Sequence, residues 1–351
     1  MANTKIPSEL VDDQVFGRRN LIINGDMQVA QRGTSTTGIG ASSGYFACDR
    51  WKLVTNGISG RLTQTQSTDT PNDFGSSTKL ECTTADTSIG ASDYFLLQQT
   101  LEGQDLQRFA KGTSSAKKFT LSFYVKGNAA ATYTYELFDN ENNRQISKTF
   151  AVTTSWNRIE LTFPADTSGA FSNDNSGRLA LKLWLQAGSN RTSGTLNSSA
   201  WASNTDANRV SSSQTNFFDS TSRTLFITGV QFEVGDQATP FEYRSIAEEL
   251  ALCQRYFTNI GYNTSWFIDA YLSSAAYSTD IITFPTEMRT TPSNSPAIDK
   301  SDFTLSNVTT DEFRVNLLSQ NAFIFQVRAS STGRTYALAN TTGNLSFDAE
   351  L

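Results

Sequence analysis

The sequence of 351 residues contains no histidine. A Ser-His-Asp triad, a Cys-His dyad and a histidine-liganded metal centre all need an imidazole, so each of these sites is excluded. An enzyme built on this chain would have to work with carboxylates, lysine or tyrosine. A glycosidase-type pair of carboxylates is the remaining candidate. The sequence singles out no such pair among Glu136, Glu160, Glu248 and Glu249.

Cysteine and long apolar runs are also scarce. Cys48, Cys82 and Cys253 are odd in number and lack CxxC spacing, which argues against a disulfide framework or a zinc site. They fit reduced, buried thiols in a protein made in a cytoplasm. No stretch approaches the ~18 apolar residues of a membrane-spanning helix, so we expect no membrane insertion. The N-terminus lacks the apolar run of a signal peptide.

Positive charge is sparse as well. Charged residues make up 18% of the chain, and the formal net charge is −6. A protein that binds nucleic acid needs a basic patch or stripe, but the largest basic clusters are the pairs Arg18-Arg19 and Lys117-Lys118. We therefore expect no nucleic-acid partner. Ser, Thr, Asn and Gln supply much of the polarity, which suits strands and turns.

Most of the chain up to Tyr243 shows a period-two alternation of apolar and polar residues, typical of half-buried strands. Strands of this kind, separated by polar turns, predict an all-β, antiparallel jelly-roll sandwich over residues 24–244. The alternation in 225–234 breaks at Gly229, where we expect a β-bulge. The polar stretch 188–214 is a long loop, and loops of this length are usually functional or disordered.

Residues 245–257 predict a single linking helix. Ser245 and Glu248 form a capping box at its start. A stripe then follows on one helix face, at the spacing i, i+4, i+7 and i+11; it consists of Ile246, Leu250, Cys253 and Phe257. A helix of about twelve residues is marginal alone. Residues 258–351 are strand-rich and predict a second, small β domain, so the helix links two β modules.

One aromatic residue points to the polar face of its strand. Trp184 lies between two core-facing leucines, so its ring shares a face with lysine and glutamine. A flat ring among hydrogen-bonding side chains is how sugar-binding sheets are built. The alternative is that a neighbouring subunit or loop covers these rings. The glycan-binding candidates are Trp184, Lys182, Gln186 and Tyr124, with Tyr262, Trp266 and Tyr271 of the C-terminal region as the rival surface.

The stretch NLIINGDMQVAQRG, residues 20–33, resembles the opening strand of carbohydrate-binding jelly rolls. Those modules often close with an acidic strand like GVQFEVG, and acidic residues near the first and last strands often hold a structural calcium. The matching carboxylates here are Asp26 and Glu233. Because hard cations take six or more oxygen ligands, the alternative is that these are two ordinary surface acids.

Five stretches together resemble tail-fibre and related virion proteins of tailed phages. They are MANTKIPSEL, RRNLIINGDMQVAQRG, DRWK, the strand-turn-helix from 229 to 257, and FPTEMRTTPS. The resemblance implies that residues 1–23 are a virion-anchoring arm and that the jelly roll is carbohydrate-binding-module-like. It also implies a homotrimer with the helix stripe at its axis and a distal C-terminal domain. The chain lacks a coiled-coil or β-helical shaft, which suggests a stubby appendage or a head fibre.

The function expected from these features is a non-enzymatic phage virion fibre protein that binds a receptor. Its partners would be phage tail or capsid proteins and host surface polysaccharide. It would be made in the host cytoplasm and would need no cofactor beyond a possible structural calcium. One alternative is a structural adaptor or capsid decoration without receptor binding. The other is a glycan depolymerase that works with carboxylates.

Overall fold

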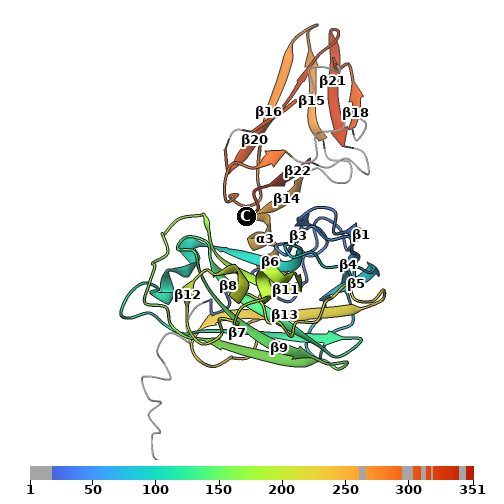
Figure 1. Ribbon diagram of the computed structural model, residues 1–351. Coiled ribbons are helices and arrows are strands. Elements are labelled where there is room, and N and C mark those ends of the chain that lie inside the picture. Colours follow the sequence, from blue (N-terminus) through green and yellow to red (C-terminus); the bar gives the residue numbers. More distant parts are fainter. Residues whose placement is uncertain (1–17, 261–265, 295–302, 310–313, 318, 340–344) are drawn as a thin grey trace, which may run out of the picture. The chain divides into compact units, whose positions relative to one another are not determined.

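The computed structural model describes residues 18–260, 266–294, 303–309, 314–317, 319–339 and 345–351 (Figure 1). The chain divides into two compact units, Met1–Arg244 and Ser245–Leu351. The fold is all-β, as the alternating pattern predicts, and every strand pair in the described residues is antiparallel. Among these residues no helix has the length and apolar character needed to cross a membrane.

The first unit is a sandwich of two sheets. Sheet A has the strand order β1-β4-β5-β13-β7-β10, and sheet B has the order β12-β9-β8-β11-β6-β3-β2. The strands of sheet A are β1 (Ser35–Ile39), β4 (Arg61–Ser67), β5 (Ser77–Thr84), β7 (Phe119–Gly127), β10 (Asn157–Phe163) and β13 (Thr224–Val234). Those of sheet B are β2 (Gly44–Tyr45), β3 (Lys52–Asn56), β6 (Tyr94–Glu102), β8 (Ala131–Asp139), β9 (Arg144–Val152), β11 (Gly177–Ala187) and β12 (Ala202–Ser203).

The core of the sandwich comes from the inward positions of these strands. In β7, Leu121 and Phe123 are 0% exposed, and in β11 the same holds for Leu181 and Leu185. They belong to one continuous apolar cluster. Each large apolar side chain removed from water contributes about 1.5–3 kcal/mol to folding. Three short helical segments lie between strands of this unit: η1 (Gly103–Phe109), α2 (Ser189–Thr192) and η2 (Asp206–Asn208).

The predicted bulge in β13 is confirmed. The register between β13 and β7 shifts between Thr228 and Gln231, and Gly229 has φ +61°. A Cβ atom at Gly229 would lie 2.6 Å from the ring of Phe74. Glycine is therefore needed here both for the backbone conformation and for the close approach of an aromatic ring.

Residues 18–23 are fixed against this bulged strand. The backbone N–H of Leu21 donates to the carbonyl of Phe232 (3.0 Å), and the side-chain amide of Asn20 donates to that of Val230 (3.1 Å). Arg244, at the end of the unit, donates from Nη1 to the carbonyl of Ile22 (2.9 Å). The predicted arm boundary at residue 23 is therefore too late, since these residues belong to the sandwich. Residues 1–17 lie outside the described residues.

The linking helix is shorter than predicted. Helix α3 spans Ile246–Gln254, and Ser245 Oγ accepts a hydrogen bond from the N–H of Glu248 (3.2 Å), as the capping box requires. Tyr256 then donates to the carbonyl of Cys253 (2.9 Å), and the chain turns into β14 (Phe257–Ile260). The pairing of β14 with another strand of the same unit ends the helix early. Phe257 is therefore a strand residue, which corrects its placement on the helix.

The second unit contains α3 and three small sheets. Their orders are β14-β22-β17, β15-β21-β18 and β16-β20-β19. The remaining strands are β15 (Trp266–Leu272), β16 (Tyr277–Thr283), β17 (Ser293–Asn294), β18 (Phe303–Ser306), β19 (Arg314–Leu317), β20 (Ala322–Arg328), β21 (Gly333–Ala339) and β22 (Leu345–Asp348). The buried aromatic residues Phe323, Phe325 and Phe347 belong to one core cluster.

Candidate functional site

Trp184 leaves β11 on the predicted side but is not exposed. Its side chain is 1% exposed, and its Nε1 donates a hydrogen bond to Glu136 Oε2 (2.9 Å). The guanidinium carbon of Arg209 lies 5.1 Å from the ring centroid, and Val210 packs in the same cluster. Both residues come from the polar loop 188–214. The prediction of an exposed ring at Trp184 is therefore wrong, and the alternative of a covering loop is correct for this residue.

Gln186 is covered in the same way and is 0% exposed. Neither of its side-chain amide atoms has a hydrogen-bond partner in the part of the chain that the structure describes. Gln214 Oε1 is also buried without a hydrogen-bond partner among the described residues, although the side-chain nitrogen of Gln214 donates to the carbonyl of Trp184 (2.9 Å). Buried polar atoms of this kind usually bind ordered water. Gln186 is too deep to contact a glycan outside the protein.

The carboxylate of Glu136 is fully engaged beneath this loop. Arg209 donates from Nε to Oε1 (2.8 Å) and from Nη2 to Oε2 (3.0 Å). Glu160 lies in β10 of the other sheet and pairs with Arg158 (3.1 Å). These two glutamates therefore do not face each other as the acid and base of a glycosidase would.

Lys182 is the one candidate of β11 that is half-buried and not fully buried. Its ammonium nitrogen lies 3.9 Å from the ring centroid of Phe138. Burial lowers the pKa of Lys182 to about 8; Glu136 opposes this shift and Arg209 adds to it. Lys182 thus combines partial access to solvent with an ammonium group that is only weakly solvated.

Tyr124 belongs to an aromatic surface on the outer face of sheet A. We define the aromatic platform as Phe74, Tyr124, Phe241 and Tyr243. Phe74 lies at its centre, with ring centroids 5.2 Å from Tyr124, 5.2 Å from Phe241 and 5.5 Å from Tyr243. Tyr243 is 53% exposed, and the other three rings are half-buried. The missing side chain at Gly229 leaves room for Phe74 against the sheet.

Polar side chains lie on strands and turns next to the platform. Arg158 is the cross-strand partner of Tyr124 and donates to the carbonyl of Thr239. Lys126, two residues from Tyr124, forms an ion pair with Asp69 and holds the pKa of that carboxyl below its usual value. Trp156 Nε1 donates to Asp69 (3.1 Å). Flat rings and hydrogen-bonding groups therefore share one face, which is the combination that a sugar requires.

Asp26 and Glu233, the carboxylates expected to hold a structural calcium, are both buried, and Oδ1 of Asp26 has no hydrogen-bond partner among the described residues. Glu233 is 2% exposed and accepts hydrogen bonds from Gln231 Nε2 (2.9 Å) and from the N–H and Oγ1 of Thr239 (2.9 and 2.7 Å). Asp26 is 4% exposed, and it accepts a hydrogen bond from Gln28. Burial raises the pKa of Asp26. Neither is a surface acid, and no group of three or more metal-ligating side chains occurs among the described residues.

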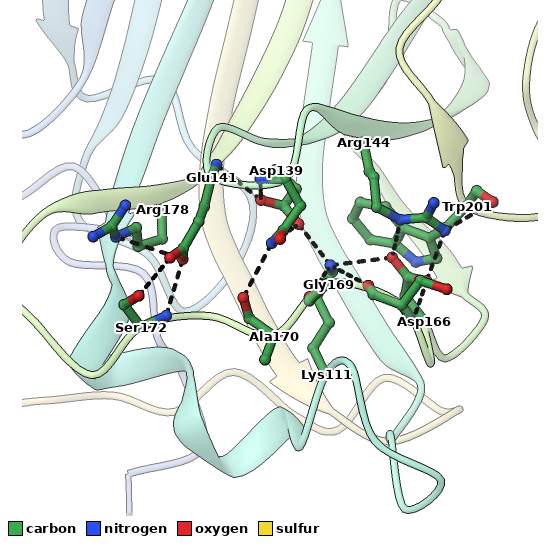
Figure 2. A network of polar contacts seen from close by, with 12 residues as sticks. Lys111, Asp139, Glu141, Arg144, Asp166, Gly169, Ala170, Ser172, Arg178 and Trp201 are labelled. Atoms are coloured by element: carbon green, nitrogen blue, oxygen red, sulfur yellow. Dashed lines mark hydrogen bonds and ion pairs between the residues drawn. The ribbon is translucent and has the colours of Figure 1, made fainter.

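A buried charge network closes one end of the sandwich (Figure 2). The side chain of Lys111 is 0% exposed, and its Nζ lies 2.6 Å from Asp139 Oδ2 and 3.1 Å from Asp166 Oδ2. The same nitrogen donates to the carbonyls of Ser168 (2.9 Å) and Gly169 (2.6 Å). Four oxygens thus surround one ammonium group, and the site is saturated.

Arg144 extends this network toward Trp201. It donates from Nε and Nη2 to the two oxygens of Asp166, both at 2.8 Å. Burial raises the pKa of Asp166, but Arg144 and Lys111 outweigh it and hold that pKa below its usual value. Figure 2 shows these side chains facing one another. Their hydrogen bonds and ion pairs connect the loops at this end of the sandwich, so the role of the network is structural.

The rival candidates of the second unit are only partly described. Tyr262 lies outside the described residues. Trp266 is the first residue of β15, and Tyr271 in the same strand is 77% exposed. The helix stripe is uneven, because Ile246 is 54% exposed whereas Cys253 is 1% exposed.

No family model matches this chain, and no curated protein matches it. Solved structures with a similar fold include three carbohydrate- or phage-related proteins. The enzymatically active domain of bacteriophage CBA120 tailspike protein 4 is 15% identical, over 62% of this chain and 21% of that one, with a TM-score of 0.32. The family 11 carbohydrate-binding module from Clostridium thermocellum, in complex with a beta-1,3-1,4-mixed-linked tetrasaccharide, is 12% identical. The match covers 59% of this chain and 98% of that one, with a TM-score of 0.31.

The third is TmCBM61 in complex with beta-1,4-galactotriose, which is 10% identical over 63% of this chain and 100% of that one, with a TM-score of 0.31. The match to the tailspike domain spans about a fifth of its length. At these identities and TM-scores, the similarities do not tell what this chain binds.

Proposed function

We propose that this chain is a non-enzymatic fibre protein of a phage virion and that its sandwich binds host-surface glycan at the aromatic platform. The observation that carries the binding part is the ring cluster of Phe74, Tyr124, Phe241 and Tyr243 on the outer face of sheet A. The sequence resemblance to phage fibre proteins supports the virion part.

The platform offers what a sugar ring needs. Tyr243 presents more than half of its surface to solvent, and its ring can cover the apolar C–H face of a pyranose. The Tyr hydroxyls, Arg158 and Asp69 supply donors and acceptors for hydroxyl groups around it. Each site of this type is weak, with a Kd of about 1 mM, or about 4 kcal/mol.

Weak single sites are compatible with firm attachment if the protein is a homotrimer, as we propose. Three sites on one fibre, and many fibres on one virion, raise the avidity by ~10²–10⁴ without any new contact. In this proposal the α3 helices meet at the three-fold axis. Residues 1–17 form the virion-binding arm, because residues 18–23 are already fixed to the sandwich.

A deletion of residues 1–17 tests the attachment to the virion. We expect the truncated protein to fold and to keep its oligomeric state but to be missing from particles assembled in its presence. Normal incorporation of the truncated protein would contradict the proposed arm. Immunogold labelling of intact virions would show at the same time whether the protein sits on the tail or on the head.

Two other functions give different outcomes. A depolymerase would release reducing ends from host polysaccharide. A steady rise of reducing ends in a reducing-sugar assay would therefore show that the protein is an enzyme and would contradict the proposed non-enzymatic function. A structural adaptor or capsid decoration would bind no glycan on an array and would leave host adsorption unchanged when it is absent from the virion. Glu136 itself is a poor candidate for such a carboxylate pair, because it is buried and both of its oxygens accept hydrogen bonds.

A further inference from the structure

A row of side chains crosses the outer face of sheet B in register. Tyr45 pairs with Lys52, Lys52 with Gln98, Gln98 with Lys182, and Lys182 with Glu136. Directly paired residues on neighbouring strands share a face, and neighbouring strands lie about 4.8 Å apart. Lys52 and Lys182 therefore stand about 10 Å apart on either side of Gln98.

The loop 188–214 covers only one end of this row. Glu136 is 0% exposed beneath it, whereas Tyr45, Lys52, Gln98 and Lys182 are only half-buried. The two cations Lys52 and Arg32 each lie 5.3 Å from the ring centroid of Tyr45. The accessible part of the row thus combines ammonium groups, one amide and one aromatic ring.

The charges around Lys182 do not balance. Glu136 is bound by Arg209 through two hydrogen bonds, and Asp206 is bound by Arg191 (2.9 Å) and by Arg209 (3.3 Å). Three cations, Lys182, Arg191 and Arg209, therefore face two carboxylates that the arginines already occupy. One positive charge is left on a half-buried ammonium group, whose exposed side is suited to an anion from outside.

We propose that Lys52, Gln98 and Lys182 bind a carboxylate-bearing glycan, such as a polymer of uronic acid. An ammonium group binds a carboxylate as a point charge, and an amide between two such groups can both donate to and accept from sugar hydroxyls. The inference rests on the proposed function in assuming that the partner is a glycan. It adds a second binding site, on sheet B, whereas the aromatic platform lies on sheet A. It also names the chemical class of the glycan.

The experiment compares tetragalacturonate with its methyl ester, in which each carboxylate is replaced by an uncharged methyl ester group on the same sugar backbone. Isothermal titration of the full-length protein should show binding of the acid and at least tenfold weaker binding of the ester. Lys182→Gln should weaken binding of the acid about tenfold, as expected for one charge-assisted contact. Lys118→Gln, which removes an exposed lysine elsewhere in the sandwich, should leave it unchanged. Gln98→Ala is a second probe of the row that keeps all charges.

The pH dependence gives a further signature. Binding of the acid should fall between pH 7 and pH 9 as Lys182 loses its proton, in the field of Glu136, Asp206, Arg191, Arg209 and Lys52. Binding to Lys182→Gln should change much less over this range. A bound carboxylate raises the pKa of the amine, so the fall shifts upward at saturating ligand.

Several outcomes would overturn the inference. They are equal binding of acid and ester, unchanged binding by the Lys182→Gln variant, and equally strong binding of tetraglutamate, which would point to an acidic peptide. The Tyr124→Ala/Tyr243→Ala double variant separates the two sites. Suppose that neutral glycans bind, that the double variant loses this binding, and that the acid and its ester bind with equal affinity. The proposed function then stands and this inference fails. If the acid binds and is insensitive to the tyrosines, the inference stands and the platform fails.

Discussion

At the scale of single residues, Lys111 is the clearest structural determinant. Lys111→Met would leave Asp139 and Asp166 without their shared ammonium group in a buried site. Breaking a buried ion pair from one side costs about 3–5 kcal/mol, because a buried charge loses its partner. We expect the free energy of unfolding of the sandwich to fall by this amount in urea titrations followed by tryptophan fluorescence.

Lys118→Met is the matched control, since Lys118 and its partner Asp236 are both more than half exposed (56% and 60%). Exposed ion pairs contribute ~0–1 kcal/mol. A loss below about 1 kcal/mol for Lys111→Met would show that the network in Figure 2 does not hold the sandwich end together.

Lys182 makes a prediction about pH. Its pKa in the folded protein is about 8, below the usual value for lysine, because burial disfavours the charged form. Between these two values the unfolded chain keeps the proton and the folded protein releases it, so stability rises with pH in this window. The difference in unfolding free energy between wild type and Lys182→Met should therefore shift in favour of wild type from pH 8 to pH 10.5. A difference independent of pH would contradict the lowered pKa.

The residue pattern predicted side-chain direction better than exposure. The alternation in β11 correctly placed Trp184 and Lys182 on the face opposite Leu183. It could not show that Arg209 and Val210, some 25 residues later, fold back onto the tryptophan. Conversely, Phe74 and Tyr243 lie in segments without alternation, and only the folded chain brings them to Tyr124. In the sequence, Tyr243 stands out only as an aromatic residue that follows Pro240, shortly after the end of β13.

At the scale of elements, the strands and the bulge could be read from the sequence because each depends on neighbouring residues. Gly229 interrupts an otherwise regular alternation, and the bulge lies there. The start of α3 at Ser245 was readable for the same reason, since the cap is local. Its end was not, because β14 begins where a distant strand, β22, pairs with it.

The helix carries the prediction about assembly. Leu250 is half-buried within the chain, and Ile246 one turn earlier is 54% exposed. If three α3 helices pack at an axis, Leu250→Asp places a charge in an apolar seam at a cost of several kcal/mol per site. We expect the trimer to dissociate in light scattering after gel filtration.

Ala247→Asp is the control for this helix. It adds the same charge at an exposed position of the first turn, where a negative charge is favourable for the helix. We expect this variant to remain trimeric. A Leu250→Asp protein with unchanged mass and unchanged melting temperature would rule out α3 as the trimer contact.

At the scale of the whole molecule, the division at Ser245 separates two β units that could each meet the host. The first unit carries the aromatic platform, and the second carries the exposed Tyr271. The sequence alone could not choose between them, because exposed aromatics occur in both. The cluster of four rings on the sandwich favours the first unit, because its rings contact one another. The second unit exposes Tyr271 (77%) and Tyr277 (47%), which lie on two different strands, β15 and β16.

The most direct measurement of this claim is binding of intact, full-length protein to a glycan array and to host cells, for two variants side by side. In the Tyr124→Ala/Tyr243→Ala variant, we predict loss of the neutral-glycan signal and of adsorption by at least tenfold, with oligomeric state and melting temperature preserved. In Tyr271→Ala, we predict binding equal to that of the wild type. Loss in Tyr271→Ala with full binding by the double variant would contradict the account and move the receptor site to the second unit.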